Sequence, residues 1–247
     1  MKSYKFSIPK PGARVLMYKD EHCVFEWLRL SDKPVNLSVE IGWEMLIACL
    51  KAPCTVSLRG SQIELSPKDM LYIARPSVLS VEGRDSLLVI AEGRSTHRST
   101  FFVERFSDAK PFTSGLEGYR RDIYTMISVE APTDSLMAGY TEGWPGEWTS
   151  FPPHKHDDKL EVYVYYGLGD GYGLQLVYDD DDDRPEASIV RDYDAVVILG
   201  GYHPNVPTPK SRICYLWILC QKKGEKNMRV DFHPCFKDWS IGKTHLK

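Results

Sequence analysis

Four side chains that can bind a metal ion stand in two short segments of the sequence. His154, His156 and Glu161 belong to PHKHDDKLEVYVYY, and His203 belongs to GGYHP. Neutral imidazoles and a carboxylate suit borderline divalent ions such as zinc, iron, manganese or nickel. This ligand set also leaves coordination positions open for water or a substrate. The four residues therefore predict one divalent ion, with zinc as the expected metal, in an enzyme that acts on a small molecule.

The alternation of side chains along a β-strand decides which residues can share the pocket. Side chains two positions apart point to the same face, so the histidine pair of the HKH sequence can point inward together. Glu161 has the opposite parity, and it can join the pair only if the chain turns over residues 157–159. Beyond Glu161, the same alternation places Tyr163 and Tyr165 on the metal side of the strand. We therefore expect two phenols beside the ion.

Short apolar runs separated by turn residues fill both halves of the chain. The first series extends from Val24 to about Val103, and the pattern restarts at Asp122 after a polar stretch. Such runs, with turn signals roughly every 8 to 12 residues, indicate antiparallel β-sandwiches or barrels. We expect an all-β fold of two tandem barrels, residues 1–110 and 118–247. The histidine spacing occurs only in the second half, so the N-terminal barrel should lack metal ligands.

The composition indicates a globular protein. The chain has 247 residues, of which 43% are hydrophobic and 26% charged, and its formal net charge is -3. This balance provides no basic face for nucleic acid, and no apolar stretch is long enough to span a bilayer. The first twenty residues also lack the pattern of a secretion signal. We therefore expect a cytoplasmic protein with small-molecule partners and no nucleic-acid or membrane partner.

The metal-binding segments resemble a known family. The chain resembles the 5-deoxyglucuronate isomerases of inositol breakdown, which belong to the cupin superfamily. The similar segments are GEWTSFPPHKHD, EVYVYY, GLQLVYDD and VRDYDAVVILGGYHP. The pattern HxHxxxxE followed by a tyrosine matches the related 4-deoxy-5-ketouronate isomerases of pectin breakdown equally well. The resemblance is strong over about residues 118–221. It implies two cupin-type barrels, a bicupin, with the four ligands above, and a chain that forms homo-oligomers.

The resemblance also implies an activity, that of a metal-dependent aldose–ketose isomerase. The expected reaction converts 5-deoxyglucuronate to 2-deoxy-5-keto-gluconate, with 4-deoxy-5-ketouronate as the other candidate substrate. Moving hydrogen between neighbouring carbons requires a titratable side chain near the ion, and Tyr163 and Tyr202 are the predicted catalytic residues. A sugar acid also requires a cation for its carboxylate, and Arg121 is the predicted one. The remaining predicted substrate contacts are Tyr165, Gln175 and Tyr178.

Two positions depart from the family pattern and leave other functions open. Tyr193 stands where a glycine is usual between two aspartates, and Leu199 stands where a proline is usual before the Gly-Tyr-His loop. Both changes lie on the way to His203, so they put the loop geometry and the substrate in question. The alternatives are a cupin dioxygenase with the same three-histidine, one-glutamate ion and a sugar-binding protein without catalytic activity.

Overall fold

The described residues form an all-β protein, as predicted. A computed structural model describes residues 2–96, 101–180 and 185–239. Strands follow one another along this part of the chain, and its helical segments are two short 3-10 turns, η1 (Phe106–Asp108) and η2 (Pro234–Phe236). The described part contains no helix long and apolar enough to cross a membrane.

The N-terminal half consists of two antiparallel sheets. Its strands are β2 (Arg14–Lys19), β3 (Cys23–Arg29), β4 (Val35–Val39), β5 (Trp43–Lys51), β6 (Cys54–Leu58), β7 (Ser61–Leu65), β8 (Met70–Ile73), β9 (Ser77–Glu82), β10 (Leu87–Arg94) and β11 (Phe101–Glu104). One sheet has the order β11-β8-β5-β10-β3-β2, and the other has the order β4-β9-β6-β7. The space between them is filled by aliphatic and sulfur-containing side chains such as Leu28, Ile47, Val56 and Leu79.

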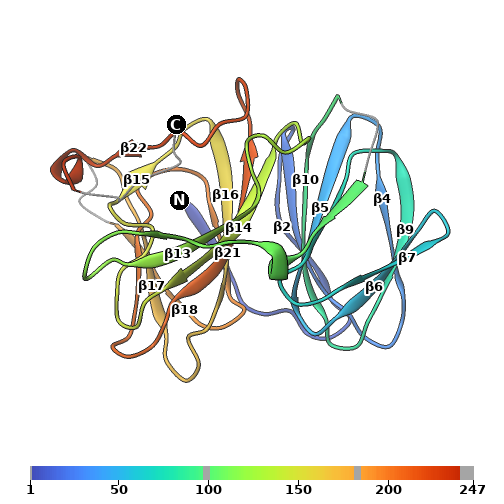
Figure 1. The fold of residues 1–247 in the computed structure, drawn as a ribbon, viewed down its shortest axis with the longest axis horizontal. Helices are drawn as coiled ribbons and strands as arrows, with labels where there is room; N and C mark the ends of the chain where they lie inside the picture. The colour runs from blue at the N-terminus through green and yellow to red at the C-terminus, as the bar shows by residue number, and fades with distance from the viewer. Residues whose placement is uncertain (1, 97–100, 181–184, 240–247) are drawn as a thin grey trace.

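The C-terminal half repeats this arrangement with a larger sheet (Figure 1). Its strands are β1 (Ser3–Phe6), β12 (Phe112–Ser114), β13 (Arg121–Ile127), β14 (Leu136–Gly143), β15 (His154–Lys155), β16 (Lys159–Tyr166), β17 (Gly173–Val177), β18 (Glu186–Val190), β19 (Ala195–Ile198), β20 (Asn205–Pro207), β21 (Cys214–Gln221) and β22 (Asp231–Phe232). Seven strands have the order β1-β19-β16-β21-β14-β13-β12, three have the order β18-β17-β20, and β15 pairs with β22. In both halves the sheets face each other without joining, so each predicted barrel is a β-sandwich.

The first strand of the chain belongs to the second half. β1 pairs antiparallel with β19. In Figure 1 it is the dark-blue strand beside the N label, among the later strands of the chain. The backbone N–H of Leu199 extends this pairing by donating to the carbonyl of Lys2, 2.8 Å away. A proline at position 199 has no N–H to donate. The predicted domains, residues 1–110 and 118–247, stay a prediction. Residues 3–6 of the first domain pair with the sheet of the second. Residues 240–247 lie outside the described part.

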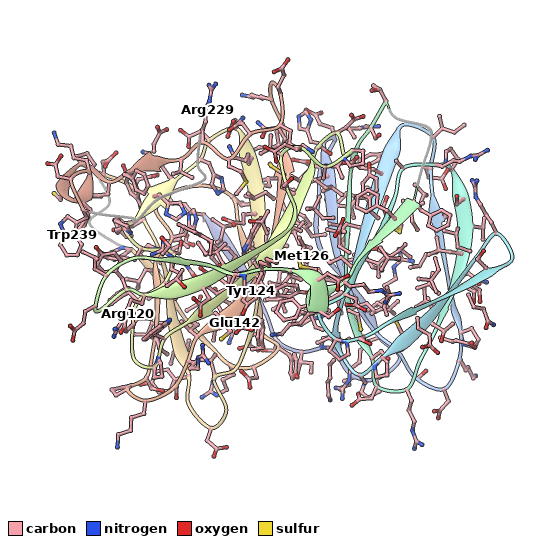
Figure 2. The ribbon with its side chains drawn as sticks, in the orientation of Figure 1. Arg120, Tyr124, Met126, Glu142, Arg229 and Trp239 are labelled. Carbon is pink, nitrogen blue, oxygen red and sulfur yellow. The ribbon has the colours of Figure 1, made fainter. Side chains whose placement is uncertain are left out.

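A third apolar core joins the two halves. The six-stranded and seven-stranded sheets pack face to face, and both contribute to it (the buried members include Phe25, Trp27, Leu46, Val89, Ile127, Val162, Val164 and Leu216). Figure 2 shows Tyr124, Met126 and Glu142 at this boundary. Glu142 Oε1 lies 2.5 Å from Lys68 Nζ of the other half. The central strands of the seven-stranded sheet, β14, β16, β19 and β21, are therefore buried on both faces.

A buried carboxylate adds polar contacts to this boundary. Glu44 on β5 is fully buried, and its oxygens accept from the backbone N–H groups of Asp134, Ser135 and Leu136, each at 2.8 Å. The Tyr72 hydroxyl donates to the same carboxylate at 2.5 Å. Glu44 thus fixes the segment that leads into β14 of the other half.

We expect Glu44→Ala to lower the free energy of unfolding by about 3 kcal/mol or more, because it leaves several buried N–H groups unpaired. Urea denaturation followed by tryptophan fluorescence measures this change. The matched control is Glu40→Ala, which removes an exposed glutamate from the same half and should have little effect. Equal stability of the two variants would contradict the role assigned to Glu44.

Candidate metal centre

Local structure brings the predicted ligands to one end of the C-terminal sandwich. His156 follows β15, and bends at residues 157 and 158 lead into β16, where Glu161 is the third residue. This is the turn that the parity of Glu161 requires. His203 follows two glycines with positive φ after β19. A Cβ on Gly201 would lie 2.8 Å from the carbonyl oxygen of Tyr178, so the approach to His203 requires a glycine there.

Three of the four predicted ligands form a compact, buried group. The ligand atoms of His156, Glu161 and His203 all lie within 4.8 Å of one another. Glu161 Oε2 is 3.0 Å from Nε2 of His156 and 3.2 Å from Nε2 of His203. No second group of this kind occurs among the described residues.

His154 lies beside this group rather than within it. Its ring centroid is 4.9 Å from that of His203. Its Nδ1 donates to the carbonyl of Pro152 at 3.0 Å, which leaves the lone pair on Nε2. Burial of the imidazole, and then the nearby His203, lower the pKa of His154 to about 3, so the ring is neutral at physiological pH. His154 can thus serve as a ligand, and its place as the fourth ligand stays a prediction.

The electrostatics of the group fit a cation. His203 Nδ1 donates to the carbonyl of Gly201 at 2.8 Å, so its buried Nε2 bears a lone pair and has no hydrogen-bond partner among the described residues. Burial alone would raise the pKa of the Glu161 carboxyl, but its interactions with the neighbouring imidazoles, with the His156 hydrogen bond first, hold this pKa below its usual range. An imidazole lone pair therefore faces a carboxylate in a buried site, and a divalent cation between them would stabilise both.

Alternation along β16 places the predicted phenols as expected. Tyr163 and Tyr165 belong to the core of the C-terminal sandwich, whereas Val162 and Val164 face the core shared by the two halves. The ring centroid of Tyr163 is 5.8 Å from that of His203, and its hydroxyl lies 3.3 Å from Ser150 Oγ. Burial raises the pKa of Tyr163 well above its usual value, so the phenol is protonated at neutral pH.

Arg121 provides an unpaired cation in the same sandwich. Its residue is only 8% exposed, and burial lowers the pKa of the guanidinium, which nevertheless keeps its charge. Within the described residues, its one hydrogen bond runs from Nη1 to the carbonyl of Tyr119 at 3.2 Å, and no carboxylate pairs with it. A guanidinium has five N–H donors, so most of its capacity is available to a ligand.

Two of the predicted substrate contacts are engaged within the protein. The Tyr165 hydroxyl donates to Gln175 Oε1 at 2.6 Å, and Asn205 Nδ2 donates to the same oxygen at 3.1 Å. Gln175 Nε2 donates to the carbonyls of Leu176 and His203. A side-chain amide has two donors and two acceptor positions, and all are in use. The structure therefore gives Gln175 internal partners for all of its polar atoms, and its contact with a substrate stays a prediction.

Tyr202 and Tyr178 lie in a separate aromatic group. Because adjacent residues of an extended chain point in opposite directions, Tyr202 points away from the group that His203 joins. The Tyr202 ring packs on Tyr178 at 5.5 Å and on His233 at 4.9 Å, and Lys155 Nζ lies 4.8 Å from its centroid. The structure thus brings neither tyrosine to the His156, Glu161 and His203 group.

Two contributors to the site were not among the residues predicted from the sequence. Tyr215 on β21 packs against Tyr163 with a centroid distance of 4.3 Å, and the alternation of the sequence CYLWIL contains the signal for this inward position. The second contributor is the C-terminal segment, whose ends Arg229 and Trp239 are labelled in Figure 2. Within it, Phe232 pairs with His154 across β22 and β15, with ring centroids 6.0 Å apart. No residue spacing in the sequence predicts the contact between Phe232 and His154.

Tyr193, one of the two departures from the family pattern, keeps the backbone of the usual glycine. Its φ is 63°, in the left-handed region that glycine adopts at little cost. Its N–H donates to the carbonyl of Tyr165 at 2.7 Å, and its ring packs on the core between the halves. The turn before β19 is therefore formed despite the substitution.

Comparison with known proteins identifies a family and several relatives of this chain. The model of the KduI/IolB family matches residues 19–239. A 5-deoxy-glucuronate isomerase of Geobacillus kaustophilus is 28% identical over 176 residues, which cover 66% of this chain and 63% of that protein. A 4-deoxy-L-threo-5-hexosulose-uronate ketol-isomerase of Cereibacter sphaeroides is 32% identical over 132 residues, 51% of this chain and 47% of that protein. The chain thus spans less than two thirds of the length of these relatives.

Solved structures show the same fold. An IolB-like protein from Salmonella typhimurium LT2 superposes with a TM-score of 0.78 at 19% identity, over 88% of this chain and 89% of that one. A cupin 2 conserved barrel domain protein from Leptotrichia buccalis has a TM-score of 0.58 at 19% identity, over 90% and 98% of the two chains. The predicted cupin fold is therefore confirmed.

We expect the purified protein to bind one divalent ion per chain and His203→Ala to weaken zinc binding by more than about 100-fold. Loss of a ligand should exceed the roughly 10- to 100-fold effect typical of residues that only support one. Mass spectrometry of the metal content and titration calorimetry measure this, and circular dichroism checks the fold. His22→Ala, far from the site in sequence and half-exposed, is the control. Full metal content in His203→Ala would place the ion elsewhere.

Proposed function

The chain belongs to the KduI/IolB family, and we propose that it is a metal-dependent aldose–ketose isomerase that converts 5-deoxyglucuronate to 2-deoxy-5-keto-gluconate. The observation that carries this proposal is an unpaired, buried guanidinium in the same sandwich as a buried group of metal-ligand type. A deoxy uronic acid needs both features, because it has a carboxylate at one end and a carbonyl beside a hydroxyl at the other. Action in the cytoplasm as a homo-oligomer also remains a proposal.

The metal site would be formed by His156, Glu161 and His203, with His154 as the fourth ligand. A divalent ion held there, with zinc as the expected one, would supply a Lewis acid for the negative charge that develops on the carbonyl and hydroxyl oxygens. The protein's part is to hold these ligands in a site from which water is largely excluded. Trp217 and Leu219 contribute to the apolar wall on the same face of the sheet.

Arg121 would bind the carboxylate of the substrate. A guanidinium pairs with a carboxylate through two parallel N–H···O bonds, and such charge-assisted bonds are stronger in a buried site. Because its charge has no carboxylate partner within the described residues, substrate binding would supply the missing anion. Arg121 would thereby orient the acid end away from the carbons that react.

Tyr163 would take part in moving the proton. Isomerisation moves one proton from the carbon that bears the hydroxyl to the carbonyl carbon and another from the hydroxyl oxygen to the carbonyl oxygen, so the atoms balance without an oxidant. Tyr163 is the predicted catalytic residue that the structure places next to His203, with Ser150 beside its hydroxyl. Tyr202 packs in the separate group with His233, so we assign the proton transfer to Tyr163.

The relative from Cereibacter sphaeroides supports 4-deoxy-5-ketouronate as the second candidate substrate. Both candidates are deoxy uronic acids, and both present a carboxylate and a carbonyl. The metal ligands and the arginine would bind both sugar acids in the same way, so an assay with each substrate distinguishes them.

We expect the metal-loaded protein to convert 5-deoxyglucuronate under strictly anaerobic conditions, because an internal hydrogen transfer consumes no oxygen. Proton NMR of the reaction mixture identifies the product, and a parallel reaction with 4-deoxy-5-ketouronate compares the substrates. Turnover that stops without oxygen and resumes on its return would indicate the dioxygenase instead. Tight binding of either sugar acid without any product would indicate the sugar-binding protein.

We expect Arg121→Ala to raise the KM for the sugar acid by about 10- to 150-fold, which corresponds to the roughly 1.5 to 3 kcal/mol of a charge-assisted hydrogen bond. Steady-state kinetics measure this change. The neighbouring Arg120, labelled in Figure 2, provides the matched control because its guanidinium pairs with Glu147. Arg120→Ala should leave KM within about twofold, and equal effects of the two substitutions would contradict a specific role for Arg121.

A further inference from the structure

Gln175 on β17 is a polar residue in an otherwise largely apolar sheet. It is 1% exposed, and its neighbours on the inner face of the strand are Gly173 and Val177. Burying an amide is unfavourable unless each of its polar atoms finds a partner. Apart from the carbonyl of the adjacent Leu176, the partners of Gln175 lie on segments that lead to or carry the candidate metal ligands.

The direct contacts of Gln175 join two of these segments. Its Nε2 donates to the main-chain carbonyl of His203 at 2.9 Å, while its Oε1 accepts from the Tyr165 hydroxyl at 2.6 Å. Tyr165 lies on β16, the strand that carries Glu161. One amide therefore fixes the backbone of one ligand relative to the strand of another.

A third segment is reached through Asn205. Its side chain donates to Gln175 Oε1, and its backbone pairs in both directions with Thr149, at 2.9 and 3.1 Å. The Thr149 hydroxyl also bonds to the Asn205 side chain. Thr149 begins the segment that ends at His154. The network of Gln175, Tyr165, Asn205 and Thr149 thus spans all the ligand-bearing segments.

We propose that Gln175 is a positioning residue that sets the spacing between His203 and Glu161 and thereby the affinity for the metal ion. This inference rests on the proposed metal centre. The physical reason is that β17 belongs to the three-stranded sheet and β16 to the seven-stranded sheet. Gln175 ties the two sheets together at the metal end of the sandwich, where an imidazole and a carboxylate must converge from opposite sides. Supporting contacts of this kind typically change metal affinity by about 10- to 100-fold.

The first test compares zinc affinity in Gln175→Met and the wild-type protein by titration calorimetry. Methionine has a similar length and no hydrogen-bonding amide, so the carbonyl of His203 and the Tyr165 hydroxyl lose their partner. We expect zinc binding to weaken by about 10- to 100-fold. The absorption spectrum of the cobalt-substituted protein should also change, because it reports the arrangement of the ligands.

The matched control is Tyr72→Phe, which removes one buried hydrogen bond, to Glu44, in the other half. Urea denaturation should show that it also loses stability, while its zinc affinity and cobalt spectrum should match the wild type. An equal loss of zinc affinity in Tyr72→Phe would mean that Gln175 acts only through general stability, and would overturn the proposal.

A milder variant, Tyr165→Phe, covers the case in which Gln175→Met does not fold. It keeps the ring and removes a single hydrogen bond to Gln175, so zinc affinity should fall by about 2- to 10-fold. Affinity within twofold of the wild type in the folded variants overturns the positioning role while leaving the metal centre intact. A wild-type protein that takes up no zinc, cobalt, iron, manganese or nickel refutes the metal centre itself and this inference with it.

Discussion

The burial of β16 on both faces is the constraint on which the candidate site depends. On one face Leu160, Val162 and Val164 pack into the core between the halves, and on the other Tyr163 and Tyr165 pack inside the C-terminal sandwich. A shift by one residue would exchange the two faces, burying tyrosines in the apolar boundary. Glu161 is held in this register, so the position of the carboxylate is decided by packing at both sides of the sheet.

The N-terminal half supports the site without contributing ligands. Its interior is filled by aliphatic and sulfur-containing side chains, and its described residues contain no group of metal-ligand type like that of the other half. Its six-stranded sheet forms the far wall of the boundary core, and Glu44 fixes the segment before β14 by accepting three backbone hydrogen bonds. The two sandwiches thus differ in role. One supports the core between the halves, and the other contains the His156, Glu161 and His203 group.

The features predictable from sequence were those that depend on periodicity or ligand chemistry. Alternation placed Glu161 with the two tyrosines, and the need for a turn before it was met by bends at residues 157 and 158. Long-range pairing was not predictable, because nothing in the first residues indicates that β1 joins β19. Tyr202 and Gln175 illustrate the same limit. Both stand next to ligands in sequence or fold, but their partners come from segments that only the folded chain brings together.

Arg121 gives the site an electrostatic cost that only a ligand can offset. Burying a charge without a partner is unfavourable, so buried arginine side chains are usually paired with an anion. Within the described residues, the one hydrogen bond of the Arg121 guanidinium goes to a backbone carbonyl, and the neighbouring aromatic side chains are phenols. A bound carboxylate would remove this cost and would itself be bound in a medium of low dielectric constant, where the attraction is strong. If the proposed function is right, Arg121 would therefore favour an anionic ligand over a neutral sugar of the same shape.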